Sequence, residues 1–182
     1  MNARYVDNCC CAYCRVLRES RVLKHISESE NVVAFSPVKI KKEKHCGSWE
    51  TLEKRIFPGY IFIYGKTEED IREAARNAHV RLLQYSDGTC LLQGNDRLFA
   101  KWIFEHDGVM TVSKAVSCGD SVLILEGPLA DLRGTVTEID KRRRLMKVKL
   151  DVNEFSVWLS FDWATNEQGF FADNFDGESA AE

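Results

Sequence analysis

Basic side chains concentrate in two short stretches of the sequence. The guanidinium group of arginine pairs with phosphate and stacks on unpaired nucleobases. Four consecutive basic residues at a tight turn therefore predict contact with RNA, and a merely solvated turn is the alternative. The stretch with this pattern consists of Lys141, Arg142, Arg143 and Arg144, followed by the outward-pointing Lys147 and Lys149. The other stretch consists of Lys39, Lys41, Lys42 and Lys44, with Lys54 and Arg55. Taken alone, it is typical of a charged strand edge that prevents aggregation.

Cysteines form a different cluster near the N-terminus, at Cys9, Cys10, Cys11 and Cys14, with Cys46 downstream. Neighbouring residues of a strand point to opposite faces, so the first three cannot converge on one ion, and we expect no metal site. The seven cysteines are an odd number in a chain without a secretion signal, which favours reduced thiols. A cysteine-dependent redox or zinc protein is the alternative.

The sequence contains no recognisable catalytic motif. The four histidines, His25, His45, His79 and His106, stand in no pairing with a nucleophile, and neither a phosphate loop nor an HExxH motif occurs. The sequence predicts a protein that is not an enzyme and carries no cofactor.

Charge divides unevenly along the 182 residues. Residues 151–182 hold eight of the 28 acids and no Lys or Arg, so residues 1–150 carry a formal charge of about +5 despite a net charge of −3. A basic body suits a nucleic-acid partner, and a body whose tail balances its charge is the alternative. Neither a signal peptide nor an apolar run of about 20 residues occurs, so we expect a cytoplasmic, membrane-free monomer.

Two regions with different periodicity must position these residues. Residues 9–106 alternate strand-like and helix-like stretches in the order βαββαβα, with strands expected at 9–16, 32–42, 55–64 and 80–85. Thr67 and Asp70 form a short-acid capping box for one helix. A sheet covered on one face by helices, as in ferredoxin-like α+β folds, is the simplest packing.

The second region consists of short strands with alternating apolar residues. These residues are Val122 and Ile124; Met146, Val148 and Leu150; and Val157, Leu159 and Phe161. Short strands at this spacing predict a small closed or partly closed barrel. The expected division is therefore a domain at 1–106, a linker at 107–116, a barrel at 117–163 and a disordered acidic tail at 164–182.

Two motifs carry a resemblance to a known family. Residues 119–136, GDSVLILEGPLADLRGTV, closely resemble the KOW motif, in which Gly-Asp and Gly-Pro turns flank a strand. Residues 55–62, RIFPGYIF, resemble the Pro-Gly-Tyr strand of the NusG N-terminal domain. Together they cover about residues 9–163, and we identify the chain as similar to NusG-family elongation and antitermination factors with an SH3-like KOW barrel. Cysteines stand where the family usually has Trp-Tyr, and Leu17 stands where Gly is common.

The resemblance implies a specific set of partners. The N-terminal domain would dock on the clamp helices of the largest subunit of RNA polymerase through an aromatic surface that includes Phe57 and Tyr60, against ordinary sheet packing as the alternative. The resemblance also implies that the lysines of residues 39–44 lie near the DNA backbone. The stretch 139–145 resembles LoaP-like antiterminators that bind structured leader RNA. A housekeeping NusG and a KOW module that contacts the small ribosomal subunit are the alternatives.

Overall fold

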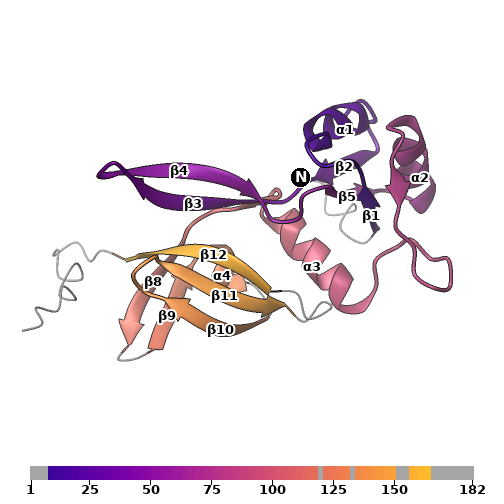
Figure 1. Cartoon of the computed structure of the whole chain (residues 1–182). Helices are drawn as coiled ribbons and strands as arrows, with labels where there is room; N and C mark the ends of the chain where they lie inside the picture. The colour runs from indigo at the N-terminus through magenta and orange to yellow at the C-terminus, as the bar shows by residue number, and fades with distance from the viewer. Residues whose placement is uncertain (1–7, 119–120, 132–133, 151–155, 165–182) are drawn as a thin grey trace, which may run out of the picture.

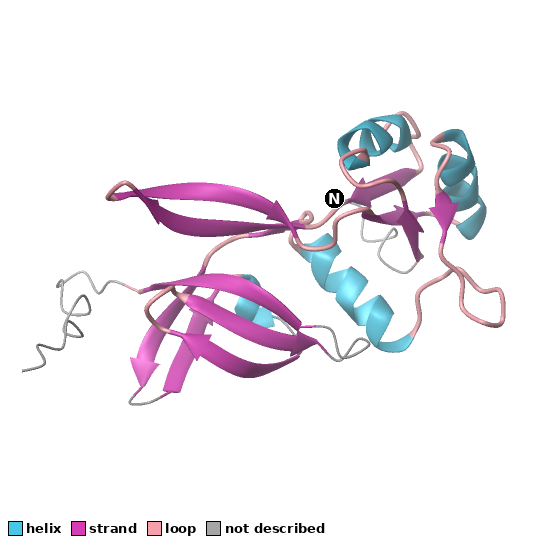
Figure 2. Ribbon diagram, viewed as in Figure 1, coloured by secondary structure: helices cyan, strands magenta, loops and turns pink. Residues whose placement is uncertain are grey.

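The computed structural model describes residues 8–118, 121–131, 134–150 and 156–164, which form a mixed α/β fold with three sheets (Figures 1 and 2). The predicted acidic tail, except Ala164, lies outside the described residues. The elements are, in order, β1 (Cys9–Tyr13), α1 (Glu19–Ile26), β2 (Val32–Phe35), β3 (Val38–His45), β4 (Ser48–Arg55), β5 (Tyr60–Gly65), α2 (Glu68–Asn77), β6 (Arg81–Leu82), α3 (Gly94–Glu105), β7 (Val109–Met110), β8 (Ser113–Cys118), β9 (Ser121–Glu126), α4 (Pro128–Asp131), β10 (Gly134–Asp140), β11 (Leu145–Leu150) and β12 (Ser156–Trp163).

The first sheet has the strand order β2-β5-β1-β6 and is covered on both faces. Helices α1 and α2 lie on one face and α3 on the other (Figure 1). Alternation along the strands explains this arrangement: Cys10, Ile61 and Ile63 pack with α1 and α2, whereas Phe62 and Tyr64 pack with α3. The capping box that opens α2 is present as predicted, since Thr67 and Asp70 bond each other's backbone N–H groups.

A hairpin of β3 and β4 interrupts the predicted strands. The sequence predicted one strand over residues 32–42, but the chain ends β2 at Phe35 and begins β3 at Val38. Pro37 lies between them and cannot donate to a ladder. The strand predicted over 55–64 is likewise divided, because residues 48–55 form β4 and β5 begins only at Tyr60, after the Pro58-Gly59 turn.

The second sheet has the order β10-β11-β12-β8-β9. Five of the side chains predicted to face its core are buried: Met146, Val148, Val157, Leu159 and Phe161. Val122 and Ile124 are partly buried against the same core. The Gly127-Pro128 turn continues into the short helix α4.

The segment predicted as a linker, 107–116, carries regular structure. Strand β7 pairs in parallel with β3, and β8 begins at Ser113 and pairs in parallel with β12. Side-chain hydrogen bonds join the two regions, and two of them leave α3 and β3. The indole Nε1–H of Trp102 in α3 donates to the carbonyl oxygen of Pro128 at 3.0 Å, and Lys39 Nζ donates to that of Trp158 at 2.8 Å. The two regions therefore share one apolar core around α3.

Candidate functional site

An exposed aromatic cluster surrounds the Pro58-Gly59 turn. Phe57 is half-buried and its ring lies 5.6 Å from that of Phe99 in α3, whereas Tyr60 at the start of β5 is 38% exposed. Tyr13 pairs in register with Tyr60, is 47% exposed and contacts the Tyr60 ring edge-on at 5.5 Å. The sequence motif pointed to Phe57 and Tyr60 but not to Tyr13, which reaches the cluster through the pairing of β1 with β5.

The turn itself is fixed by a buried carboxylate. Gly59 has φ +86, and its backbone N–H donates to Oε1 of Glu19 at 2.7 Å, while its carbonyl accepts from Cys14 N–H at 2.8 Å. Glu19 is 1% exposed, and Arg55 Nε lies 3.8 Å from its Oε2. Burial would raise the pKa of Glu19, but hydrogen bonds from the backbone of Glu19 and Gly59, with the Arg55 charge, hold that pKa below its ordinary value.

The lysines of β3 have different surroundings. Lys39 bonds the backbone of β12, and burial lowers its pKa, with the charges of Lys41 and Lys54 lowering it further. Both Lys41 and Lys54 pair with Glu43. These contacts favour a structural role for Lys39 over contact with phosphate.

The other two lysines of β3, Lys42 and Lys44, are placed by the pairing of β3 with β4. Lys42 lies opposite Thr51 and Lys44 lies opposite Trp49 in the hairpin ladder. Their use as a nucleic-acid surface stays a prediction.

The predicted basic tip is the turn between β10 and β11. Arg142 and Arg143 are exposed, and Arg143 donates its backbone N–H to Asp140 at 2.8 Å. Arg144 has φ +54, and its guanidinium pairs with Asp162 of β12. Lys141 is half-buried. The exposed charge of the tip therefore resides mainly on Arg142 and Arg143.

The lysines of β11 lie beside the tip, on the opposite face from the buried Met146 and Val148, as predicted. Lys149 is exposed. Lys147 is half-buried, with Nζ 5.8 Å from the centre of the Trp158 ring and 3.7 Å from Glu138. Lys147 therefore has less freedom to reach phosphate than the exposed arginines.

The cysteines of β1 alternate between the two apolar faces of the sheet, as the sequence predicted. Cys10 Sγ lies 3.2 Å from Cys90 Sγ, and both are buried. Burial raises the pKa of Cys10, and it raises that of Cys11 to about 12, so these thiols are protonated at neutral pH. Within the described ranges, no three His, Cys, Asp or Glu side chains are placed to hold a metal ion, and no helix has the length and apolar character needed to cross a bilayer.

Comparisons with known proteins agree with the motifs. No family model matches the chain. The transcription termination/antitermination protein NusG of Thermus thermophilus is 30% identical over 137 residues, which cover 63% of this chain and 69% of that protein. The protein of the same name from Pasteurella multocida is 24% identical over 134 residues, covering 70% and 72%, and that from Synechocystis is 26% identical over 146 residues, covering 68% and 66%.

A solved structure of domain interaction in Thermotoga maritima NusG aligns with 84% of this chain and 93% of that one, with a TM-score of 0.46 and 19% identity. The identity to the Thermus protein, over more than two thirds of its length, decides the assignment. The chain belongs to the NusG family of transcription termination/antitermination proteins.

Proposed function

We propose that this chain binds bacterial RNA polymerase during elongation and acts there as an antitermination or elongation factor without catalytic chemistry. The observation that carries the proposal is the exposed aromatic cluster of Tyr13, Phe57 and Tyr60. Aromatic side chains bury large areas with little loss of conformational entropy and often dominate interface energies. Relatives are named transcription termination/antitermination proteins, which supports the same process for this chain. Its compartment would then be the cytoplasm.

The partner on the polymerase would be the clamp helices of the largest subunit. An α-helical partner presents ridges of apolar side chains, and a patch of aromatic rings where the two central strands β1 and β5 end would suit such a surface. Phe57 would act mainly as a support, since its ring packs against Phe62 and Phe99, and Tyr60 and Tyr13 would supply the exposed contact area.

The domain division belongs to the same proposal. We assign residues 1–106 to a ferredoxin-like polymerase-binding domain, supported by the order β2-β5-β1-β6 with α1 and α2 on one face. Residues 117–163 would be an SH3-like KOW barrel, supported by a five-stranded sheet around one core, whose strand β8 begins earlier, at Ser113. The segment 107–116 would connect them.

A binding assay with immobilised bacterial core polymerase tests the docking surface. Tyr60→Ala and Tyr13→Ala should each weaken binding at least fivefold, because loss of an interface anchor costs more than about 1 kcal/mol. Leu123→Ala is the matched control, since Leu123 is a large apolar side chain, 56% exposed, in β9 of the other region. Equal affinity of all three variants and the unmodified chain would refute docking through the aromatic cluster.

We further propose that the barrel contacts structured leader RNA through the basic tip, the turn between β10 and β11. Its support is the exposure of Arg142 and Arg143 on one turn. Charge reversal of these two residues should abolish the shift of a leader hairpin in a gel assay and reduce terminator readthrough on that template. Arg144 is left unchanged, because its pairing with Asp162 makes it part of the barrel's structure. RNA binding by the reversed variant at unchanged affinity would contradict the proposal.

A further inference from the structure

The end of β12 lies beside the basic tip, the turn between β10 and β11 (Figure 1). Two contacts of β12 fix this position. The backbone N–H of Phe161 donates to the carbonyl oxygen of Arg144 at 3.0 Å, and the side chain of Asp162 pairs with the Arg144 guanidinium. Ala164 then donates its backbone N–H to the carbonyl oxygen of Ala115 at 2.8 Å. The chain therefore leaves the second sheet next to the basic tip.

The tip presents positive charge to solvent. Arg142 is exposed, and within the described ranges no carboxylate pairs with its guanidinium. The side chain of Arg143 is 78% exposed, and Asp140, 3.8 Å from its Nε, neutralises it in part. Exposed charges act over about 8–10 Å at physiological ionic strength, so an anionic segment that begins beside the tip lies within their field.

Apolar side chains lie at the same end of the second sheet. Trp163 is half-buried, and its ring lies 5.0 Å from that of Phe161. Ile139, which precedes the tip, is partly buried against the same core as Trp163. Leu145, the first residue after the tip, is half-buried. A segment that carries both acids and apolar side chains would therefore meet complementary groups here, because burial of apolar surface adds to the attraction between charges.

The residues that follow Ala164 have a composition that complements this surface. Residues 165–182, which we call the acidic segment, contain five acids and neither Lys nor Arg. The acids are Glu167, Asp173, Asp176, Glu178 and Glu182. Three phenylalanines stand among them, Phe170, Phe171 and Phe175. The same stretch therefore offers carboxylates for the arginines and rings for the apolar side chains, and guanidinium planes also stack on aromatic rings.

The connection between the sheet and the acidic segment is short. Asp162 contacts Arg144 two residues before Ala164, and Arg142 and Arg143 adjoin Arg144. An extended chain advances about 3.3 Å per residue, so residues 165–170 reach about 20 Å from Ala164. A segment tethered at this range is present at an effective concentration in the mM range. Weak contacts are therefore sufficient for docking, although each exposed ion pair contributes little.

We propose that the acidic segment docks on the basic tip of the same chain, with carboxylates paired to Arg142 and Arg143 and phenylalanine rings on the apolar side chains beside the tip. The docked segment competes with anionic ligands. An effective concentration of several mM and an intrinsic dissociation constant of about 1 mM weaken ligand binding about fivefold. Weakly bound polyanions are thereby excluded, and a ligand of high affinity displaces the segment. The competition with RNA rests on the function proposed above, whereas the docking requires neither RNA nor polymerase.

Two variants of the full chain test the docking. The neutralised variant replaces the acids of the segment: Glu167→Gln, Asp173→Asn, Asp176→Asn, Glu178→Gln and Glu182→Gln. The ring variant replaces the phenylalanines, Phe170→Ser, Phe171→Ser and Phe175→Ser, and leaves the net charge unchanged. Glu69→Gln is the matched control, since Glu69 is an exposed acid on α2 that pairs with Arg76.

Amide chemical shifts measured by NMR report the docking without any ligand. We expect both variants to shift the amide signals of residues 139–145, and Glu69→Gln to leave them in place. Sodium chloride at about 0.5 M should move the signals of the unmodified chain toward those of the neutralised variant, because salt screens exposed charges. Unchanged signals at residues 139–145 in both variants would overturn the proposal. Signals of the unmodified chain that approach those of the variants on tenfold dilution would also overturn it, since they would assign the docking to a second copy.

Fluorescence anisotropy with a labelled RNA hairpin of mixed sequence tests the competition. The neutralised variant should bind the hairpin about fivefold more tightly than the unmodified chain, and the ring variant at least twofold more tightly. The ring variant separates docking from a long-range effect of net charge. In a chain that also carries Arg142→Gln and Arg143→Gln, the ring substitutions should change the affinity by less than twofold. A ring variant that binds no more tightly than the unmodified chain would overturn the competition.

The two assays also separate this proposal from the function proposed above. If Arg142→Gln with Arg143→Gln binds the hairpin as tightly as the unmodified chain, the RNA contact of the tip is refuted. The amide shifts then decide the docking by themselves, because they are measured without RNA.

Discussion

Replacing Glu19 by glutamine tests whether one buried carboxylate holds the turn that displays Phe57 and Tyr60. Glutamine keeps the size of the side chain and an acceptor for the Gly59 N–H, which lies 2.7 Å from Oε1, but it removes the charge. A hydrogen bond to a charged group contributes about 1.5–3 kcal/mol and a neutral one about 0.5–1.5 kcal/mol. The partly exposed pair with Arg55 adds about 0.5 kcal/mol. We therefore expect Glu19→Gln to lower the free energy of unfolding by about 2 kcal/mol at pH 7.

The pH dependence gives this prediction a second test. The pKa of Glu19 is lower in the folded protein than in the unfolded chain, so its stabilisation is fully present above the ordinary carboxyl pKa of about 4.3 and is lost as the pH falls through the folded pKa. In urea titrations, the deficit of Glu19→Gln should be constant from pH 6 to 8 and shrink below pH 4. Glu69→Gln, at an exposed pair with Arg76, should cost less than about 0.5 kcal/mol. A deficit under about 0.5 kcal/mol at pH 7, or one that persists below pH 4, refutes the reasoning.

Three further predictions follow from particular contacts. Gly59→Ala should lower the free energy of unfolding in urea by about 2 kcal/mol, since φ is +86 and the new Cβ would lie 2.9 Å from the carbonyl oxygen of Cys14; Gly47→Ala, with φ +90 and open space, should cost only about 1 kcal/mol. Lys39→Met removes the hydrogen bond to β12 and should speed hydrogen exchange of β12 amides severalfold, which mass spectrometry measures, and unchanged exchange would contradict the bridging role. Iodoacetamide should label the exposed Cys46 well before the buried thiols of β1, and simultaneous labelling would contradict their protection.

Local patterns predicted the elements whose signals lie within a few residues. The pairing of Thr67 with Asp70 opens α2 as the capping box predicts, and the alternation at Met146 and Val148 buries these side chains in the second sheet. Such signals work because capping and strand alternation depend on backbone geometry over one turn or two residues.

Contacts between elements explain what the sequence did not predict. Strand β4 is charged and has no apolar run, and its partner β3 stabilises it through the ladder from Val38–Arg55 to His45–Ser48. The phosphate contact predicted for Lys39 stays a prediction, and the sequence did not predict that this side chain bonds a carbonyl 119 residues away in β12. Tertiary contacts of this kind outweigh the local preference for solvation.

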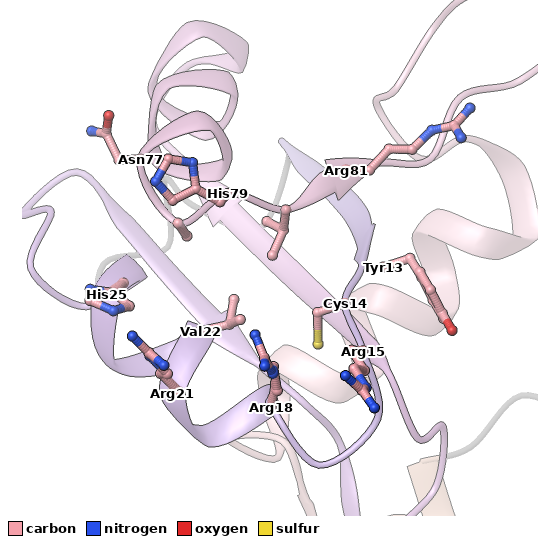
Figure 3. Close-up of a pocket in the computed structure, with 12 residues that line it drawn as sticks. Tyr13, Cys14, Arg15, Arg18, Arg21, Val22, His25, Asn77, His79 and Arg81 are labelled. Atoms are coloured by element: carbon pink, nitrogen blue, oxygen red, sulfur yellow. The ribbon is translucent and has the colours of Figure 1, made fainter.

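A cleft between the β1–α1 segment and the α2–β6 segment, lined by basic side chains, escaped prediction for the same reason (Figure 3). Arg15, Arg18 and Arg21 belong to the β1–α1 segment, whereas His79 and Arg81 follow α2, and no run of consecutive bases marks either segment. Packing of α1 beside α2 on one face of the first sheet brings the two segments together. Sequence reasoning weighs charge along the chain, so it detects a run such as Lys141–Arg144 and misses charges gathered by folding.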